Sequence, residues 1–392
     1  MPTGAKDIRG HALDIVTVCK QSNRFRQRHT LSTPQGAEVL RGDRRLINFC
    51  SNDYLGLANH TEVVRAFMQG AERYGVGSGA SHLVCGHSNA HAALEEQLAE
   101  FVGRQRAILF STGYMANLAI VSTLLNRGDV VFGDRLNHAS MIDAVNMSRA
   151  KLRRYAHGDA SGLADGLRRT DADHKLVLTE GVFSMGGDIS PLPALAEKCR
   201  AADAWLGVDD AHGFGVLGAS GAGTVEHFGL STEEVPVLMA TLGKALGCFG
   251  AFVAGDETVV EAILQTARTY IYTTAPPAAL AVAAMRALDL LGEENWRREY
   301  LQDLIRRFRK EALALGIPVS KSMTPIQPLI IGTDLDTLAV SQALLGKGFL
   351  ITAIRPPTVP EGTARLRITL TASHSEQQVA DLLEALASIL CK

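Results

Sequence analysis

The stretch Trp205–Gly213, WLGVDDAHG, shows the pattern that decides the fold, because a short apolar run leads at once into charged and polar residues. The same order recurs in Val237–Lys244, VLMATLGK, where an apolar run leads into a glycine and a lysine. Short apolar runs bounded by turn residues are typical of strands buried on both faces of a parallel sheet. The carboxyl ends of such strands face one crevice, so the polar residues after each run are candidates for ligand binding.

Similar runs, separated by helical patterns, extend along most of the chain. Strands are predicted at Arg106–Phe110, Asp129–Phe132, Leu176–Leu178, Trp205–Val208, Val237–Ala240, Ala251–Ala254, Pro328–Ile331 and Arg365–Leu370. Apolar residues at helical spacing occur in two sets: Leu94, Leu98, Phe101 and Val102, then Val260, Ile263, Leu264 and Ala267. This alternation predicts an α/β fold with a mainly parallel sheet covered by helices.

The chain is expected to divide into three parts. These are an N-terminal segment (1–50), a large domain (51–285) and a smaller C-terminal α+β domain (286–392). The charged stretch Gly292–Arg309 is predicted to form a long helix that joins the two domains. The last helix is predicted to begin at Ser373, with Glu376 three residues later as its capping partner. Its buried face would be Val379, Leu382, Leu383, Leu386 and Leu390.

Composition excludes several classes of protein. The 392 residues are 46% hydrophobic and carry a net charge of -2, which provides no positive field for nucleic acid. No secretory signal and no apolar run of about 18 residues is present, so a cytoplasmic protein is expected. The cysteines form no CxxC pair, and reduced thiols without a metal site are predicted. They are Cys19, Cys50, Cys85, Cys199, Cys248 and Cys391.

Common motifs for nucleotides and hydrolysis are absent. Gly243-Lys244 is not a phosphate loop, because Leu238 and Ala245 stand where that motif requires Gly and Ser or Thr. Gly75, Gly77 and Gly79 do not follow a strand as a dinucleotide fingerprint must. Neither GxSxG nor HExxH occurs.

What remains is a set of polar residues at four strand ends. Ser111–Asn117 precedes a helix whose free N–H groups could hold a phosphate, and Ser184 could donate to one. Asp209 follows the run Trp205–Val208, and Lys244 follows the run Val237–Ala240. Taken singly, Lys244 is more typical of a surface lysine and Ser184 of a turn serine, while Asp209 is equally compatible with a helix cap. Together they match what pyridoxal phosphate (PLP) needs: phosphate donors, a carboxylate and a lysine.

The motifs that surround these residues resemble those of the α-oxoamine synthases, which are fold-type I PLP-dependent transferases. The resemblance extends from Arg24 to the last helix. It rests on Asn52–Leu57 (NDYLGL), Thr179–Met185 (TEGVFSM), Val208–Gly213 (VDDAHG) and Thr241–Lys244 (TLGK). It implies that the large domain binds PLP and that the protein is an acyltransferase.

The resemblance also assigns cofactor roles. It makes Lys244 the Schiff-base anchor and the base that takes the α-proton, and it pairs Asp209 with the pyridine nitrogen. The resemblance implies that His138 stacks on the cofactor ring and that His212 forms a hydrogen bond with the cofactor's 3′-oxygen. Gly113 and Tyr114 would line the cofactor site, and Ser184 and Thr241 would hold its phosphate. In the homodimer that the resemblance implies, with active sites at the interface, Thr273 and Thr274 would reach the partner's phosphate.

The substrates follow from the same resemblance. Glycine-using relatives typically have Tyr-Pro where this chain has Arg355-Pro356, which indicates L-alanine condensed with a pimeloyl thioester, an early step of biotin biosynthesis. The acyl carrier is coenzyme A or acyl carrier protein. Arg367 would grip the amino acid carboxylate, and Asn52 and Thr358 would position substrate. Arg26 would lie near the far end of the acyl chain, although its basic run is equally compatible with a solvated turn.

Three alternatives stay open at the level of sequence. A sibling synthase would use glycine or serine with another acyl-CoA. A PLP aminotransferase would form pyridoxamine phosphate and a keto acid. A non-enzymatic regulator with the PLP fold would lack the bound cofactor.

Overall fold

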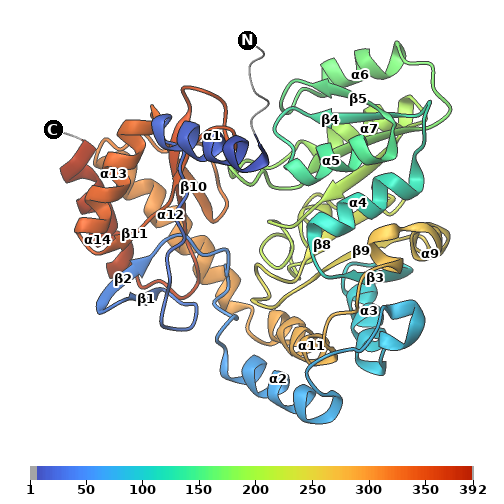
Figure 1. The fold of residues 1–392 in the computed structure, drawn as a ribbon, viewed down its shortest axis with the longest axis horizontal. Coiled ribbons are helices and arrows are strands. Elements are labelled where there is room, and N and C mark those ends of the chain that lie inside the picture. The colour runs from blue at the N-terminus through green and yellow to red at the C-terminus, as the bar shows by residue number, and fades with distance from the viewer. Residues whose placement is uncertain (1–6, 391–392) are drawn as a thin grey trace.

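The computed structural model describes residues 7–390 and contains a large seven-stranded sheet in one lobe (Figure 1). The strand order is β3-β9-β8-β7-β6-β4-β5. The bounds are β3 Arg106–Phe110, β4 Val130–Asp134, β5 Lys151–Tyr155, β6 Lys175–Glu180, β7 Trp205–Asp209, β8 Val237–Thr241 and β9 Ala251–Gly255. Only β9 runs antiparallel to its neighbours, so the predicted mainly parallel sheet is confirmed.

Helices cover both faces of this sheet because its strands are apolar on both sides. Neighbouring residues of β6 show the alternation, since Leu176 and Leu178 belong to one core cluster and Val177 to another. The first cluster is covered by α4 (Gly113–Leu124), α5 (Ala139–Ser148), α9 (Glu257–Thr266) and α10 (Arg268–Ile271). The second is covered by α6 (Ala160–Arg168), α7 (Leu192–Ala201) and α8 (Thr224–His227).

A second lobe contains two small sheets. One has the order β10-β13-β12 (Ile326–Gly332, Ala364–Thr369, Ala353–Ile354) and the other β1-β2-β11 (Glu38–Arg41, Arg44–Asn48, Phe349–Leu350). Because β2 pairs with β11 in parallel, this part of the N-terminal segment joins the carboxyl-terminal half of the chain. The helices of this lobe are α12 (Trp296–Ala314), α13 (Asp334–Gly346) and α14 (Glu376–Leu390).

The two lobes share one hydrophobic core. That cluster includes Phe49, Leu94, Leu288, Phe308 and Leu386. It brings together α2 (Thr61–Tyr74), α3 (Asn89–Phe101), α11 (Ala278–Glu293), α12 and α14. The boundaries of the three-part division remain a prediction.

Two predicted helices begin elsewhere. The stretch Gly292–Arg309 holds the predicted long helix, but α12 begins at Trp296 and extends to Ala314, while Gly292 and Glu293 belong to the end of α11. The last helix is capped by Ser375 and not by Ser373. The Ser375 hydroxyl accepts from the Gln378 N–H at 3.1 Å, and the Gln378 side chain accepts from the Ser375 N–H at 3.0 Å. The expected capping box therefore exists two residues further along.

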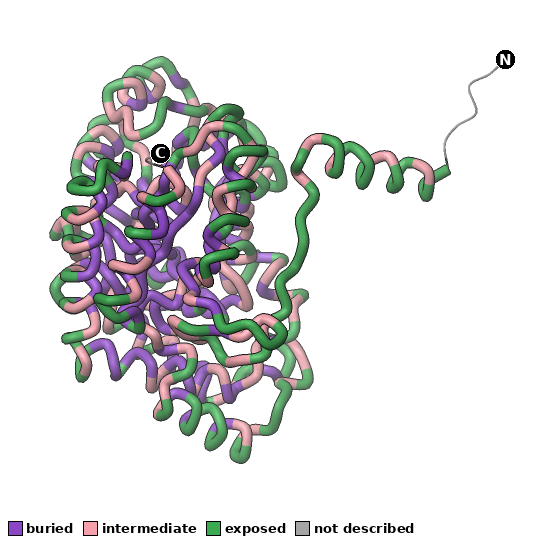
Figure 2. The backbone as a smooth tube through the Cα atoms, turned by 90° about the vertical axis from the view of Figure 1, so that its left-hand side faces the viewer, coloured by how far each residue is buried: buried purple, intermediate pink, exposed green. Residues whose placement is uncertain are grey.

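The helix α1 (Ile8–Gln21) stands apart from the body of the molecule (Figure 2). None of its residues is buried. Within residues 7–390, no helix combines the length and the apolar character needed to span a bilayer. The five cysteines of this range are free thiols, and Cys391 lies outside it.

Candidate active site

The strand ends predicted to bind a ligand do surround a cavity. It has a volume of about 190 Å³ and lies at the carboxyl ends of β7 and β8. It is called the cofactor cavity below. Its lining residues are Gly113, Tyr114, Asn117, His138, Ser140, Glu180, Asp209, Ala211, His212, Met239, Thr241 and Lys244. Seven of the predicted site residues therefore meet in one place.

Lys244 is held by a chain of polar contacts. Its Nζ lies 2.8 Å from His212 Nε2, and His212 Nδ1 lies 2.5 Å from the Tyr54 hydroxyl. Burial lowers the pKa of Lys244 to about 8, against the opposing effect of the Asp209 carboxylate. Burial and the neighbouring lysine hold the pKa of His212 well below its usual range. The lowered pKa of Lys244 therefore raises the fraction of free amine near neutral pH.

Asp209 is the last residue of β7 and is fixed by two donors. Its carboxylate accepts from the Asn117 side-chain amide at 2.8 Å and from the Ala211 N–H at 3.1 Å. The same Asn117 amide donates to the Ser140 hydroxyl at 2.9 Å, and that hydroxyl lies 2.8 Å from His138 Nδ1. One amide therefore couples the carboxylate to the histidine predicted to stack on the cofactor. Burial lowers the pKa of His138, which favours its neutral ring.

Glu180 is a second buried carboxyl in the cavity. Burial and the nearby Asp209 raise its pKa to about 8, which favours a neutral carboxylic acid at pH 7. One oxygen accepts from the Ser184 N–H at 3.0 Å, while the other is buried without a hydrogen-bond partner. Next to it, a side chain at Gly181 would overlap with the Asp210 carboxylate, so this turn requires glycine.

The other end of the cavity is the N-terminus of α4. Thr112 caps this helix, accepting from the Met115 N–H at 3.2 Å, and Gly113 and Tyr114 form its first turn. Thr241 stands opposite and donates to the Gly250 carbonyl at 2.9 Å. A helix N-terminus with a hydroxyl nearby is suited to an anionic group such as a phosphate.

Arg367 on β13 connects the cavity to the second lobe. It donates to the Ser184 carbonyl at 2.7 Å, to Asn52 Oδ1 at 3.0 Å and to the Thr369 hydroxyl at 2.9 Å. The predicted residues Asn52, Ser184 and Arg367 thus lie together. Ser184 is buried beside Glu180 but is not among the residues that line the cofactor cavity.

The remaining predicted residues lie elsewhere. Arg26 and Thr358 line a separate cavity of about 600 Å³ between the segment 20–29 and the loop 351–358, which is called the outer cavity below. Arg355 lies in the same wall. Thr273 and Thr274 follow α10 and do not line either cavity of this single chain.

Some polar neighbours carried no predicted role. Tyr54, Asn117 and Glu180 all belong to segments quoted from the sequence. In the structure, Tyr54 contacts His212, Asn117 donates to Asp209, and Glu180 accepts from the Ser184 N–H. Glu180 is the last residue of β6, so its place at a strand end was an available signal, whereas Asn117 lies within α4.

Comparisons with known proteins agree with this geometry. The family model described as aminotransferase class I and II matches residues 44–386. The 8-amino-7-oxononanoate synthase of Cellvibrio japonicus (strain Ueda107) is 57% identical over 94% of this chain and 92% of its own length. That of Ectopseudomonas mendocina (strain ymp) is 59% identical over 93% of each chain.

Solved structures give the same picture. A serine palmitoyltransferase from S. paucimobilis, with bound PLP and myriocin, superposes with a TM-score of 0.92 at 28% identity, covering 98% of each chain. An 8-amino-7-oxononanoate synthase from Francisella tularensis superposes with a TM-score of 0.77 at 35% identity. It covers 88% of this chain and 97% of the Francisella chain.

Proposed function

The chain belongs to the aminotransferase class I and II family and, within it, to the 8-amino-7-oxononanoate synthases, and from this premise we propose that it condenses L-alanine with a pimeloyl thioester. The products are 8-amino-7-oxononanoate, carbon dioxide and the free thiol carrier, in an early step of biotin biosynthesis. The observation that carries the proposal is the contact between Lys244 and His212 beside the fixed Asp209 carboxylate.

The residues of the cofactor cavity fit PLP. The cavity is lined by an amine, a carboxylate and a helix N-terminus. PLP carries one group to match each of these, namely an aldehyde for the amine, a pyridine nitrogen for the carboxylate and a phosphate for the helix N-terminus. Lys244 would hold the aldehyde carbon, Asp209 the ring nitrogen, and Gly113, Tyr114 and Thr241 the phosphate. When bound, the cofactor supplies an electron sink for the carbanion at the amino acid α-carbon.

Proton transfer is assigned to Lys244. Its amine, with a pKa lowered to about 8, is a base of suitable strength to take the α-proton of alanine near neutral pH. His212 forms a hydrogen bond with the lysine nitrogen, and Tyr54 holds the imidazole ring through its other nitrogen. These two contacts fix the orientation of the amine. Asp209, which is fixed by Asn117, would favour a proton on the cofactor's ring nitrogen.

The amino acid carboxylate is assigned to Arg367. The guanidinium is buried and already held by three oxygen acceptors, so it presents its remaining N–H groups in a fixed direction. Asn52 positions the substrate through the same guanidinium. The Ser184 carbonyl accepts from Arg367 and so helps to hold this arginine. The role of Ser184 at the cofactor phosphate rests on the family resemblance alone.

The acyl thioester is assigned to the outer cavity. Arg26 and Arg355 give that cavity positive charge, which suits the free carboxylate of a pimeloyl chain, and Thr358 lies in the same wall. The carbonyl carbon of the thioester forms a bond with the alanine α-carbon. The thiolate leaves and takes a proton. The carboxylate of alanine is then lost as carbon dioxide, and the α-carbon takes up a proton in its place.

The assembly is proposed to be a cytoplasmic homodimer. Thr273 and Thr274 do not line the cofactor cavity of their own chain, which agrees with a role in the partner's cavity. The carrier of the acyl group is coenzyme A or acyl carrier protein, and no other macromolecular partner is proposed.

One assay tests the reaction. The cofactor-loaded enzyme is incubated with pimeloyl-CoA and, in separate reactions, with L-alanine, glycine or L-serine, and products are identified by mass. We expect 8-amino-7-oxononanoate with alanine as the fastest product. A faster condensation with glycine or serine would overturn the assignment of the amino acid, and formation of pyridoxamine phosphate with a keto acid would favour an aminotransferase.

A further inference from the structure

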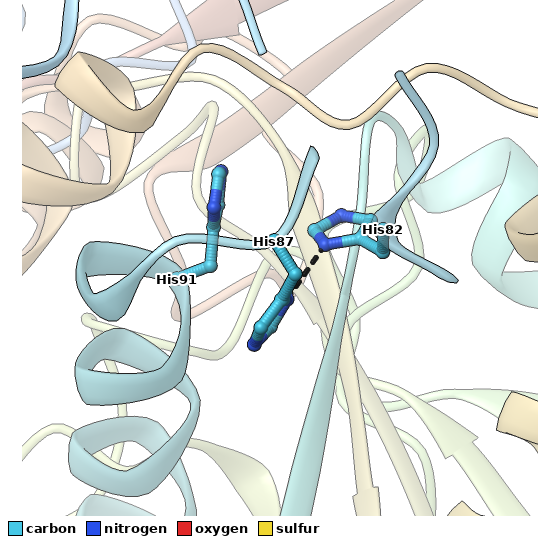
Figure 3. Close-up of side chains that lie close together, drawn as sticks. All are labelled: His82, His87 and His91. Carbon is cyan, nitrogen blue, oxygen red and sulfur yellow. Dashed lines mark hydrogen bonds between the residues drawn. The ribbon is translucent and has the colours of Figure 1, made fainter. Parts of the chain in front are cut away.

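Three histidines lie close together outside both cavities. His82 begins the short π-helix η1 (His82–Gly86), His87 follows it, and His91 lies in the first turn of α3 (Figure 3). One ring nitrogen from each histidine lies within 4.8 Å of the corresponding nitrogens of the other two. No role for these residues was expected from the sequence.

Neighbouring groups already orient two of the rings. His91 Nε2 lies 2.8 Å from the Pro276 carbonyl, which can only accept, so this nitrogen carries the proton. Its Nδ1 accepts from the Ser88 N–H at 3.0 Å. His87 Nε2 lies 3.9 Å from a Glu95 carboxylate oxygen, and His87 Nδ1 lies 2.8 Å from His82 Nδ1.

The site is partly enclosed. His91 is 1% exposed and His82 is 8% exposed, while His87 lies at the surface. His82 stacks on Tyr270 with 4.9 Å between ring centroids, and its Nε2 is buried without a hydrogen-bond partner. A neutral imidazole keeps one ring nitrogen without a proton, and that nitrogen can act as a metal ligand.

We propose that His82, His87 and His91 form a binding site for a divalent transition-metal ion of the zinc class. Three neutral imidazoles are a preferred ligand set for Zn²⁺, with water or a carboxylate in the fourth position. The surface position of His87 leaves one side open for that fourth ligand.

The geometry requires only small movements. Zn–N bonds of about 2.0–2.1 Å in a tetrahedron place ligand nitrogens about 3.3 Å apart. The 2.8 Å contact between His82 and His87 must therefore open slightly, and the longer separations must close. His91 Nδ1 would exchange its contact with the Ser88 N–H for the metal.

The partners behind the rings are those typical of metal-binding histidines. Such histidines usually direct their second nitrogen to a carboxylate or a backbone carbonyl. Here the Pro276 carbonyl serves His91, and the Glu95 carboxylate faces His87.

A bound ion would stabilise a specific turn. His91 contacts the Pro276 carbonyl, Ala275 donates to the Ala80 carbonyl at 3.0 Å, and Ser81 forms a β-bridge with Thr274. The metal would therefore fasten the segment 81–91 to the turn 274–276. The metal site itself does not depend on the proposed reaction.

The test is a binding measurement on intact protein. Tag-free, cofactor-loaded enzyme is depleted of metal with a chelator and titrated with Zn²⁺ by calorimetry, beside the variants His87→Ala and His227→Ala. His227 is a surface histidine outside the cluster and serves as the matched control. We expect one Zn²⁺ per chain in the wild type and in His227→Ala, with binding at least about tenfold weaker in His87→Ala.

Thermal denaturation gives a second readout that needs no activity. Zn²⁺ should raise the Tm of the wild type and of His227→Ala and leave that of His87→Ala unchanged. Equal binding and equal Tm shifts in both variants would overturn the site, as would a wild type that takes up no Zn²⁺. Failure of the alanine condensation would instead overturn the proposed reaction and leave this result unaffected.

Discussion

The cofactor cavity and the outer cavity differ in how firmly their side chains are held. In the first, buried groups contact one another at 2.5 to 2.8 Å, as in the chain from Tyr54 through His212 to Lys244. In the second, the key residues Arg26 and Thr358 are exposed, and the cavity is about 600 Å³. Bond making and proton transfer need fixed groups, whereas a flexible acyl chain tolerates an open cavity.

The largest effect should come from removing the amine of the cofactor cavity. Lys244→Ala should lower kcat by at least about a thousandfold, because it removes both the base and the cofactor anchor. The measurement is the rate of product formation with L-alanine and pimeloyl-CoA. Lys347→Ala removes an exposed lysine and should keep full activity. Full activity in Lys244→Ala would show that the cavity is not the reaction site.

A smaller effect should come from the arginine that joins the cavity to the second lobe. Arg367→Lys keeps the charge but loses the planar fork, so the KM for L-alanine should rise by about tenfold to a hundredfold. Arg365→Lys, two residues earlier on the same strand, is the control and should change this KM little. An unchanged KM in Arg367→Lys would place the carboxylate elsewhere.

The outer cavity should respond more weakly. Arg26→Ala removes an exposed charge, which is worth about 1 kcal/mol, so the KM for the pimeloyl thioester should rise by about fivefold. The KM for L-alanine should stay the same. Arg28→Ala, an exposed arginine that does not line the cavity, is the control. Equal effects of the two variants would favour the solvated turn and remove the acyl assignment.

The smallest effect concerns stability and not catalysis. His157 lies between two carboxylates, 3.0 Å from Asp134 and 2.7 Å from Asp188, and they raise its pKa from 6.5 to about 10. A raised pKa stabilises the folded state fully below about pH 6.5, and this contribution is lost as the pH rises toward 10.

His157→Gln should therefore lower the free energy of unfolding by about 1 kcal/mol at pH 6, because the ion pairs are partly exposed. The difference from the wild type should shrink toward pH 10, as measured by urea denaturation at both values. His174→Gln, at a more exposed histidine beside Asp129, is the comparison. A difference that does not change with pH would exclude the ionic contribution.

The sequence was sufficient for the elements whose burial is uniform. Residues such as Leu206 and Leu238 are apolar because both faces of their strands are covered, so the runs predict the sheet directly. The edge strand β5, KLRRY, was missed because an edge strand carries charged residues and shows no apolar run. Of two neighbouring serines, the wrong one was taken as the cap of α14, since both Ser373 and Ser375 fit the local pattern.

The site was predictable where a residue follows a strand. Asp209, Lys244 and His212 meet because neighbouring parallel strands end at the same edge. Contacts made across the chain, such as Asn117 with Asp209, depend on tertiary packing and leave no mark in sequence spacing. The cluster of His82, His87 and His91 is visible in the sequence, because three histidines within ten residues can be recognised as a possible ligand set.

We propose that Lys244 holds the cofactor covalently. The most direct measurement is reduction of the cofactor-loaded enzyme with borohydride, followed by proteolysis and mass spectrometry of the peptides. We expect one phosphopyridoxyl group per chain, on the peptide that contains Lys244. A label on another lysine, or no covalent label, would contradict it.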